Sequence, residues 1–150
     1  MSEIKYKIIG RKYADALKHL MMTVMGALEN PAFFIPYSNA EMNDMFSDDH
    51  ILVGAFDDKK LVGFSLVVMV GNIGDWDGSM TAPEYRGCGI MSETFRRCMA
   101  IARKSGIKKI FARAHPDNIA SINGVKKNGF IEKEKTEWDG QPRILFELVL

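Results

Sequence analysis

The stretch Arg86–Met91, Arg-Gly-Cys-Gly-Ile-Met, lies between a predicted strand and a predicted helix and limits the possible folds more than any other part of the sequence. Its two glycines let the main chain turn with N–H groups pointing inward. The unpaired N–H groups of the following helix add a partial positive charge. Such a loop suits a pyrophosphate. Taken alone, Gly-x-Gly after a strand is also typical of an ordinary tight turn.

The hydrophobic pattern of the rest of the chain predicts both hairpins and strand–helix units. Three- and four-residue spacing predicts helices over 11–29, 40–46, 90–105 and 118–128, the last with Asp117 as its N-cap. Strands are expected over 4–9, 51–56, 60–70, 75–82, 107–114, 130–138 and 143–150. This combination indicates a mixed α/β fold with helices on the faces of a mixed sheet.

Length and composition predict a single domain over residues 1–150, because 47% of the residues are apolar and 26% are charged. A net charge of +1 gives no bulk attraction to nucleic acid or membrane. The N-terminus lacks a signal-peptide core, and the longest apolar run, Leu66–Val70, is too short to span a bilayer. We therefore expect a cytoplasmic protein. Cys88 and Cys98 lie too far apart for a disulfide and have no zinc spacing, so no metal site is expected.

Two nucleotide-binding classes agree with the loop but not with its context. A dinucleotide-binding fold needs a further glycine three residues after Gly89, where this chain has Ser92. That fold also places its loop after the first strand of a parallel unit. A P-loop needs Gly-Lys-Ser/Thr, which the sequence lacks.

With its flanks, the stretch resembles the acyl-CoA signature of the GNAT N-acetyltransferase superfamily, Arg/Gln-x-x-Gly-x-Gly/Ala between a central strand and a helix. Residues 82–93 carry this resemblance, and residues 117–130, from Asp-Asn to Gly-Phe, resemble the second motif of the family. The predicted order of elements also matches over the whole chain. The resemblance implies a mostly antiparallel mixed sheet, splayed after its central strand, and acetyl-CoA as cosubstrate.

The resemblance also implies where acetyl-CoA would be bound. The main chain of Ser79, Met80 and Thr81 would pair with the pantetheine arm like an added strand. The Asn118 side chain would hydrogen-bond the cosubstrate near its pantetheine or acetyl end. The loop beginning at Arg86 would hold the pyrophosphate through the amides of Gly87, Cys88, Gly89, Ile90, Met91 and Ser92.

Three positions depart from the family pattern. Met91 replaces a small residue, and we expect its side chain to pack inward while its N–H still serves the phosphate. Val125 stands where the family often has a tyrosine general acid, and Arg113 where it often has a glutamate base. Another group must therefore remove the proton from the acceptor amine. The leaving thiolate needs no dedicated acid, because it is a comparatively good leaving group.

A general base for the amine must titrate near neutral pH. Asp75 and Asp77 lie at i and i+2 on a predicted strand, hence on one face, where like charge would raise one pKa. The alternative is that both are ordinary turn and edge residues. His115 is the other candidate base, although before Pro116 it could equally order a loop. Cys88 at a helix start suggests an acetyl-cysteine, but direct attack by the amine is favoured.

Aromatic residues are expected to shape the acceptor pocket, with core packing as the alternative; they are Phe33, Tyr37 and Trp76. The sequence thus predicts an acetyl-CoA-dependent N-acetyltransferase that acts on a primary amine of a small molecule or peptide in a ternary complex. The alternative is an acyl-CoA-binding sensor with little turnover. No nucleic-acid or membrane partner is expected, and dimerisation through edge strands is compatible with the resemblance.

Overall fold

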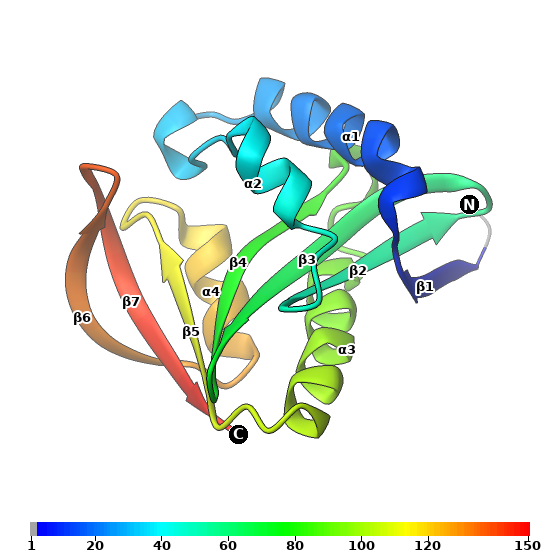
Figure 1. The fold of residues 1–150 in the computed structure, drawn as a ribbon. Coiled ribbons are helices and arrows are strands. Elements are labelled where there is room, and N and C mark those ends of the chain that lie inside the picture. Colours follow the sequence, from blue (N-terminus) through cyan, green and yellow to red (C-terminus); the bar gives the residue numbers. More distant parts are fainter. Residues whose placement is uncertain (1–2) are drawn as a thin grey trace.

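The computed structural model describes residues 3–150 and contains a seven-stranded sheet in the order β1-β2-β3-β4-β5-β7-β6 (Figure 1). Neighbouring strands are antiparallel except β4 and β5, which are parallel. The predicted mixed, mostly antiparallel sheet is thereby confirmed. The strands are β1 (Ile4–Ile8), β2 (His50–Asp57), β3 (Lys60–Val70), β4 (Ile73–Thr81), β5 (Lys109–Ala114), β6 (Ile131–Trp138) and β7 (Gln141–Val149).

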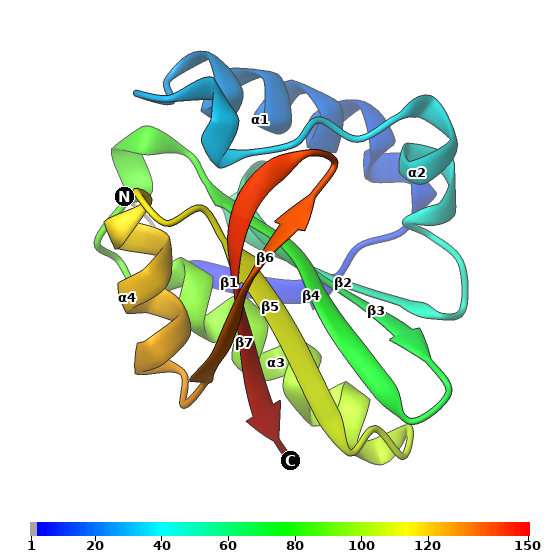
Figure 2. The same cartoon turned by 90° about the vertical axis from the view of Figure 1, so that its left-hand side faces the viewer.

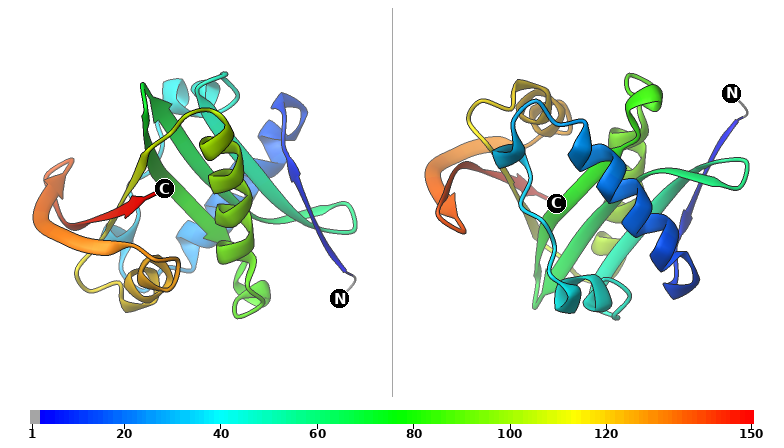
Figure 3. Two further views of the ribbon diagram at one scale, coloured as in Figure 1. Left: turned by 90° about the horizontal axis from the view of Figure 1, so that it is seen from below. Right: turned by 90° about the horizontal axis from the view of Figure 1, so that it is seen from above.

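Helices cover both faces of the sheet, with α1 and α2 on one face and α3 and α4 on the other (Figures 2 and 3). All four lie where the sequence predicts them, and 3-10 turns precede α1, α2 and α3. The helices are α1 (Ala14–Gly26), α2 (Asn39–Asp44), α3 (Ile90–Lys104) and α4 (Ile119–Lys127), and the 3-10 turns span Arg11–Tyr13, Pro31–Phe33 and Pro83–Tyr85.

One helix boundary differs from its prediction. Asn118, not Asp117, is the N-cap of α4, and its side-chain oxygen accepts a hydrogen bond from the Ser121 amide at 3.2 Å. The preceding turn explains the shift, because the Asn118 amide donates to the His115 carbonyl oxygen. The chain therefore completes a turn at Asn118 before the first helical residue.

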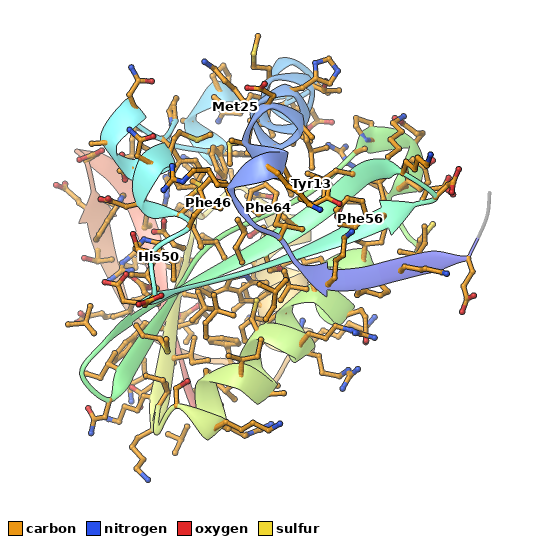
Figure 4. The ribbon with its side chains drawn as sticks, turned by 45° about the vertical axis from the view of Figure 1, so that its right-hand side comes forward. Tyr13, Met25, Phe46, His50, Phe56 and Phe64 are labelled. Carbon is orange, nitrogen blue, oxygen red and sulfur yellow. The ribbon has the colours of Figure 1, made fainter. Side chains whose placement is uncertain are left out.

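The sheet separates two hydrophobic cores. On the α1 side, Leu17 and Val24 pack with Phe64 of β3, and Figure 4 shows Phe64 in the layer between the sheet and α1. On the α3 side, Phe95 and Ala102 belong to the second core. Their helical spacing places these residues on one face of each helix, as the apolar pattern predicts.

A bulge in β4 and a separation of strands occur at one point of the sheet. Val67 of β3 pairs with Trp76 and Leu66 pairs with Gly78, so Asp77 is the extra residue on β4. Beyond the bulge the alternation is reversed, so Met80 packs in the α1-side core although Trp76 packs in the α3-side core. Pairing between β4 and β5 ends at Trp76. The predicted splay of the sheet is therefore confirmed.

Among residues 3–150, no helix has the length and apolar character needed to cross a membrane. Both cysteines are free, Cys88 exposed and Cys98 buried. Within the same range, no three His, Cys, Asp or Glu side chains gather as ligands for a metal ion.

Candidate active site

A cavity of about 770 Å³ opens where β4 and β5 separate. One wall is the end of β4, and the loop before α3 with the first turn of that helix forms another. The start of α4 and the segment 33–37 between α1 and α2 line further parts, as do residues of β5 and of the β6–β7 hairpin. The cavity thus borders every segment to which the sequence assigns a binding role.

The loop 86–89 forms an open cradle at the N-terminus of α3. Gly87 and Gly89 have φ angles of +78° and +79°, which favour glycine. A Cβ atom at either position would meet nothing within 4 Å, so the space in front of the loop is open. No side chain caps the helix, which leaves the amides of Ile90 to Ser92 available for a ligand. A pyrophosphate fits this arrangement because main-chain donors and the helix dipole converge on it.

The side chain of Met91 turns away from the cradle. It packs against α4, where a Cβ atom on Gly124 would lie only 2.9 Å from the Met91 Cε atom. The expected inward packing of Met91 is therefore confirmed. The neighbouring Ser92 hydroxyl accepts a hydrogen bond from Asn128 at 3.3 Å. Arg86 and Cys88 are exposed, so the cradle presents amides rather than packed side chains to the cavity.

The edge of β4 that faces the gap carries free main-chain groups. The Ala82 amide donates to the Val62 carbonyl of β3 at 2.8 Å. Because antiparallel pairs alternate, Met80 also directs its N–H and C=O groups towards β3, whereas Ser79 and Thr81 direct theirs into the gap. The expectation that Met80 offers its main chain to the pantetheine arm is therefore corrected, and Ser79 and Thr81 remain the positions predicted to pair with it.

Three hydroxyl groups connect this edge of β4 to the cradle. Ser65 Oγ lies 3.1 Å from Ser79 Oγ and 2.7 Å from Thr94 Oγ1. Thr94 Oγ1 in turn donates to the Ile90 carbonyl oxygen at 2.8 Å. The network fixes β4 relative to the first turn of α3. Sequence reasoning missed Ser65 and Thr94 because each lies singly within an apolar strand or helix pattern, and only the packing of α3 on the sheet joins them.

Asn118 has two roles that its amide group can fill together. Its Oδ1 atom caps α4, while the residue also lines the cavity. No described residue accepts a hydrogen bond from its Nδ2 group, so that group remains a donor at the cavity wall. This agrees with the predicted hydrogen bond to the cosubstrate.

Asp77 is the carboxylate that the bulge places in the cavity wall. The residue is exposed, and it lines both the main cavity and a smaller hollow of about 240 Å³ beside α2. Burial raises the pKa of Asp77 to about 6, and the charges of Asp75 and Glu41 add to this effect, whereas His50 and Arg113 lower the pKa. A carboxylate with a pKa near 6 is ionised at pH 7 and can still accept a proton.

Asp75 is held by Arg113 of the neighbouring strand. The guanidinium Nη1 atom donates to both carboxylate oxygens, at 2.8 and 2.9 Å, and the guanidinium carbon lies 4.4 Å from the Trp138 ring centroid. Burial raises the pKa of Asp75, although Arg113 opposes this. Asp75 is absent from the described lining of the main cavity, so Asp77 is the better placed of the two carboxylates predicted as a base.

His115 is buried and orders the loop between β5 and α4. Its Nδ1 atom accepts a hydrogen bond from the Asp117 amide at 3.1 Å, and its ring centroid lies 5.2 Å from that of Phe33. The ring is not part of the described cavity lining. These contacts agree with the alternative that the sequence leaves open for His115, an ordering role in this loop.

Tyr37 and Phe33 line the cavity, as the sequence predicts. The Tyr37 hydroxyl donates to the Asp77 carbonyl oxygen at 3.3 Å. A Cβ atom at Gly78 would collide with this hydroxyl, so the glycine permits the close approach. Burial, followed by the charges of Asp77 and Glu41, raises the pKa of Tyr37 well above 10, and the phenol stays protonated.

Trp76 contributes more to the core than to the cavity. It is 7% exposed and stacks on Phe95 with ring centroids 3.9 Å apart. Its edge touches the cavity, but its Nε1 atom is buried without a hydrogen-bond partner among the described residues. Most of the Trp76 side chain therefore packs in the core, as the alternative prediction for this residue states.

Known proteins resemble this chain in sequence pattern and in fold. Residues 16–130 match the acetyltransferase (GNAT) family. Among curated proteins, none matches the sequence significantly.

Solved structures with this fold include members of the same family at low sequence identity. The GNAT domain of S. lividans PAT has a TM-score of 0.82 at 18% identity, over 98% of this chain and 90% of that one. An acetyltransferase of the GNAT family from Streptococcus pneumoniae has a TM-score of 0.77 at 19% identity, over 99% and 100% of the two chains. PaiA N-acetyltransferase from Thermoplasma acidophilum, solved in complex with coenzyme A, has a TM-score of 0.72 at 19% identity, over 99% of each chain.

Proposed function

This chain belongs to the acetyltransferase (GNAT) family, and we propose that it transfers the acetyl group of acetyl-CoA to a primary amine of a small molecule or peptide. One observation carries the proposal: a single cavity holds the amide cradle 87–92 and the carboxylate of Asp77. The cradle suits the pyrophosphate of acetyl-CoA, and the carboxylate suits an ammonium ion that must lose a proton.

In the proposed reaction the acceptor first gives one ammonium proton to Asp77. The neutral nitrogen then attacks the thioester carbonyl carbon, forming the C–N bond. When the C–S bond breaks, its electron pair stays on sulfur, and the remaining excess proton on nitrogen neutralises the thiolate. Of the two free N–H groups on the open edge of β4, at Ser79 and Thr81, we assign the one nearer the thioester to the oxyanion and the other to the pantetheine arm.

A second function is supported by two replaced residues. Val125 is buried, 3% exposed, and cannot act as an acid. Arg113 is bound to Asp75 and cannot act as a base. A chain without these groups could bind acyl-CoA as a sensor with little turnover. Asp77 is the feature that favours the enzyme, because its raised pKa provides a base in the absence of the glutamate.

Thiol release from acetyl-CoA in the presence of a panel of primary amines tests the proposal. Turnover with at least one amine that is lost in Asp77→Asn, but kept in Asp15→Asn, would support it. Asp15 is a suitable control because it is an exposed carboxylate on α1, outside the cavity lining. Coenzyme A binding without release on any amine would favour the sensor, and the absence of both would refute both functions.

A further inference from the structure

Arg143 is a buried cation in the wall of the cavity. It lies on β7, is only 5% exposed, and borders the cavity because the segment between α1 and α2 covers it. Its Nη2 atom donates to the Ala32 carbonyl of that segment at 2.8 Å, and its Nη1 atom donates to the Pro142 carbonyl at 2.7 Å. No carboxylate of residues 3–150 forms an ion pair with it.

This environment leaves the guanidinium group incompletely paired. A guanidinium has five N–H donors, and two carbonyl oxygens use only two of them. A buried charge without a counter-charge is costly. Burial accordingly lowers the pKa of Arg143, with no acidic neighbour acting against it. An incoming anion would supply both the missing charge and acceptors for the unused donors.

Arg113, the neighbouring arginine in the cavity wall, differs from Arg143 because it has a carboxylate partner. Arg113 of β5 pairs with Leu145 across the sheet, so it lies on the same face as Arg143, two residues away on β7. Arg113 already donates two hydrogen bonds to the Asp75 carboxylate. Of these two cavity-lining arginines, only Arg143 has its charge unmatched by a described carboxylate.

We propose that Arg143 binds a carboxylate group of the acceptor, which makes the acceptor an amine that also carries a carboxylate, as an amino acid does. This assignment rests on the proposed acetyl transfer. The charges in the cavity orient such a molecule, because Asp77 attracts the ammonium group and repels the carboxylate while Arg143 does the reverse. Arginine is suited to this role because its planar fork matches the two carboxylate oxygens.

Paired acceptors provide the kinetic test. Each L-amino acid is compared with its amide and with the amine that lacks its carboxylate, using thiol release from acetyl-CoA. A hydrogen-bonded charge pair predicts roughly 10- to 100-fold higher kcat/KM for the acid form, mainly through KM. Arg143→Met should remove this preference, whereas Arg103→Met should keep it, because Arg103 is exposed on α3 outside the cavity. Arg143→Lys keeps the charge without the fork and should retain part of the preference.

Binding of the reaction products separates this proposal from the proposed function. N-acetyl-L-amino acids and their N-acetyl amides are titrated by calorimetry into the coenzyme A-loaded protein, which needs no turnover. Tighter binding of the acids that is lost in Arg143→Met supports the carboxylate site even if no amine is acetylated. The proposal would be overturned if the wild type showed equal kcat/KM for acid and amide acceptors, or equal affinity for the acid and amide products. A loss in Arg143→Met that is the same for acid and amide would also overturn it, since a purely structural tether to Ala32 predicts that result.

Discussion

The two ends of the cavity are built in different ways. The cradle end uses main-chain amides of consecutive residues, 87–92, and its side chains either turn away or lie in solvent. The acceptor end uses side chains from separate elements, among them Asp77 of β4 and Arg143 of β7. Main-chain sites tolerate side-chain replacement, so Met91 and Cys88 can occupy the cradle. The acceptor end depends on each partner, so single replacements there change the chemistry.

The largest effect is expected at the acceptor end, from Asp77→Asn. Loss of a general base should lower kcat/KM for the amine roughly 100- to 10,000-fold. In the wild type, kcat/KM should rise with pH through the pKa of Asp77, about 6, because the protonated form cannot accept a proton. A pH–rate profile that keeps this acidic limb in Asp77→Asn would remove Asp77 from the mechanism.

A smaller effect is expected at the cradle, from Gly89→Val. Its φ of +79° is strained for a branched residue, at a cost of about 1–3 kcal/mol, so the loop should rearrange. We expect the KM for acetyl-CoA to rise roughly 10- to 100-fold while the KM for the amine changes little. Initial rates at varied acetyl-CoA measure this, and an unchanged KM would show that the loop amides are not used.

Arg113→Met tests whether the ion pair between Asp75 and Arg113 influences the pKa of Asp77 at the acceptor end. While Asp75 stays ionised, the pKa of Asp77 rises, because the Arg113 charge that lowers it is gone and the unpaired Asp75 charge still raises it. The acidic limb of the pH–rate profile should move to higher pH, and activity at pH 6 should fall roughly 3- to 10-fold. Arg113→Lys keeps the charge and should shift the limb less. A limb that stays in place would mean that the pair does not influence the base.

Gly78→Ala should have an effect of only a few-fold. A Cβ atom there displaces the Tyr37 hydroxyl, and the segment that covers the acceptor end must move. We expect the KM for the amine to rise roughly 3- to 5-fold, since one neutral hydrogen bond is lost. Gly124→Ala is the matched control, because its Cβ would meet only the flexible end of Met91. Equal changes in both variants would mean that Tyr37 does not shape the acceptor end.

The smallest effect is a gain in stability in Asp77→Asn. The folded protein holds the Asp77 proton up to a pH of about 6, against 3.8 for the ordinary carboxyl, so ionisation between these values destabilises the fold. The variant should be more stable at pH 7 by on the order of 1 kcal/mol, after allowance for solvent screening of this accessible carboxylate, and equal to the wild type below pH 4. Thermal denaturation at pH 7 and 3.5 measures this. A gain at both values would point to a cause other than the charge.

The difference between the two ends also explains what the sequence could reveal. The cradle lies in one contiguous stretch, so the glycines at 87 and 89 and the helical pattern after them predict its conformation, and the resemblance of its flanks to a known family implies its ligand. A glycine inside a strand, such as Gly78, often marks a bulge or a close approach of the backbone. The pairing of Asp75 with Arg113 spans 38 residues and depends on the register of β4 with β5, which no local pattern contains. Arg143 reaches the cavity only because Ala32, 111 residues earlier, folds over it.

In our proposal one cavity combines a main-chain cradle for coenzyme A with a separate carboxylate that activates the acceptor. Calorimetric titration of coenzyme A into the wild type, Asp77→Asn and Gly89→Val tests this separation. We expect one binding site per chain, equal affinity in the wild type and Asp77→Asn, and weaker binding in Gly89→Val. No binding to the wild type, or affinity lost in Asp77→Asn but retained in Gly89→Val, would contradict it.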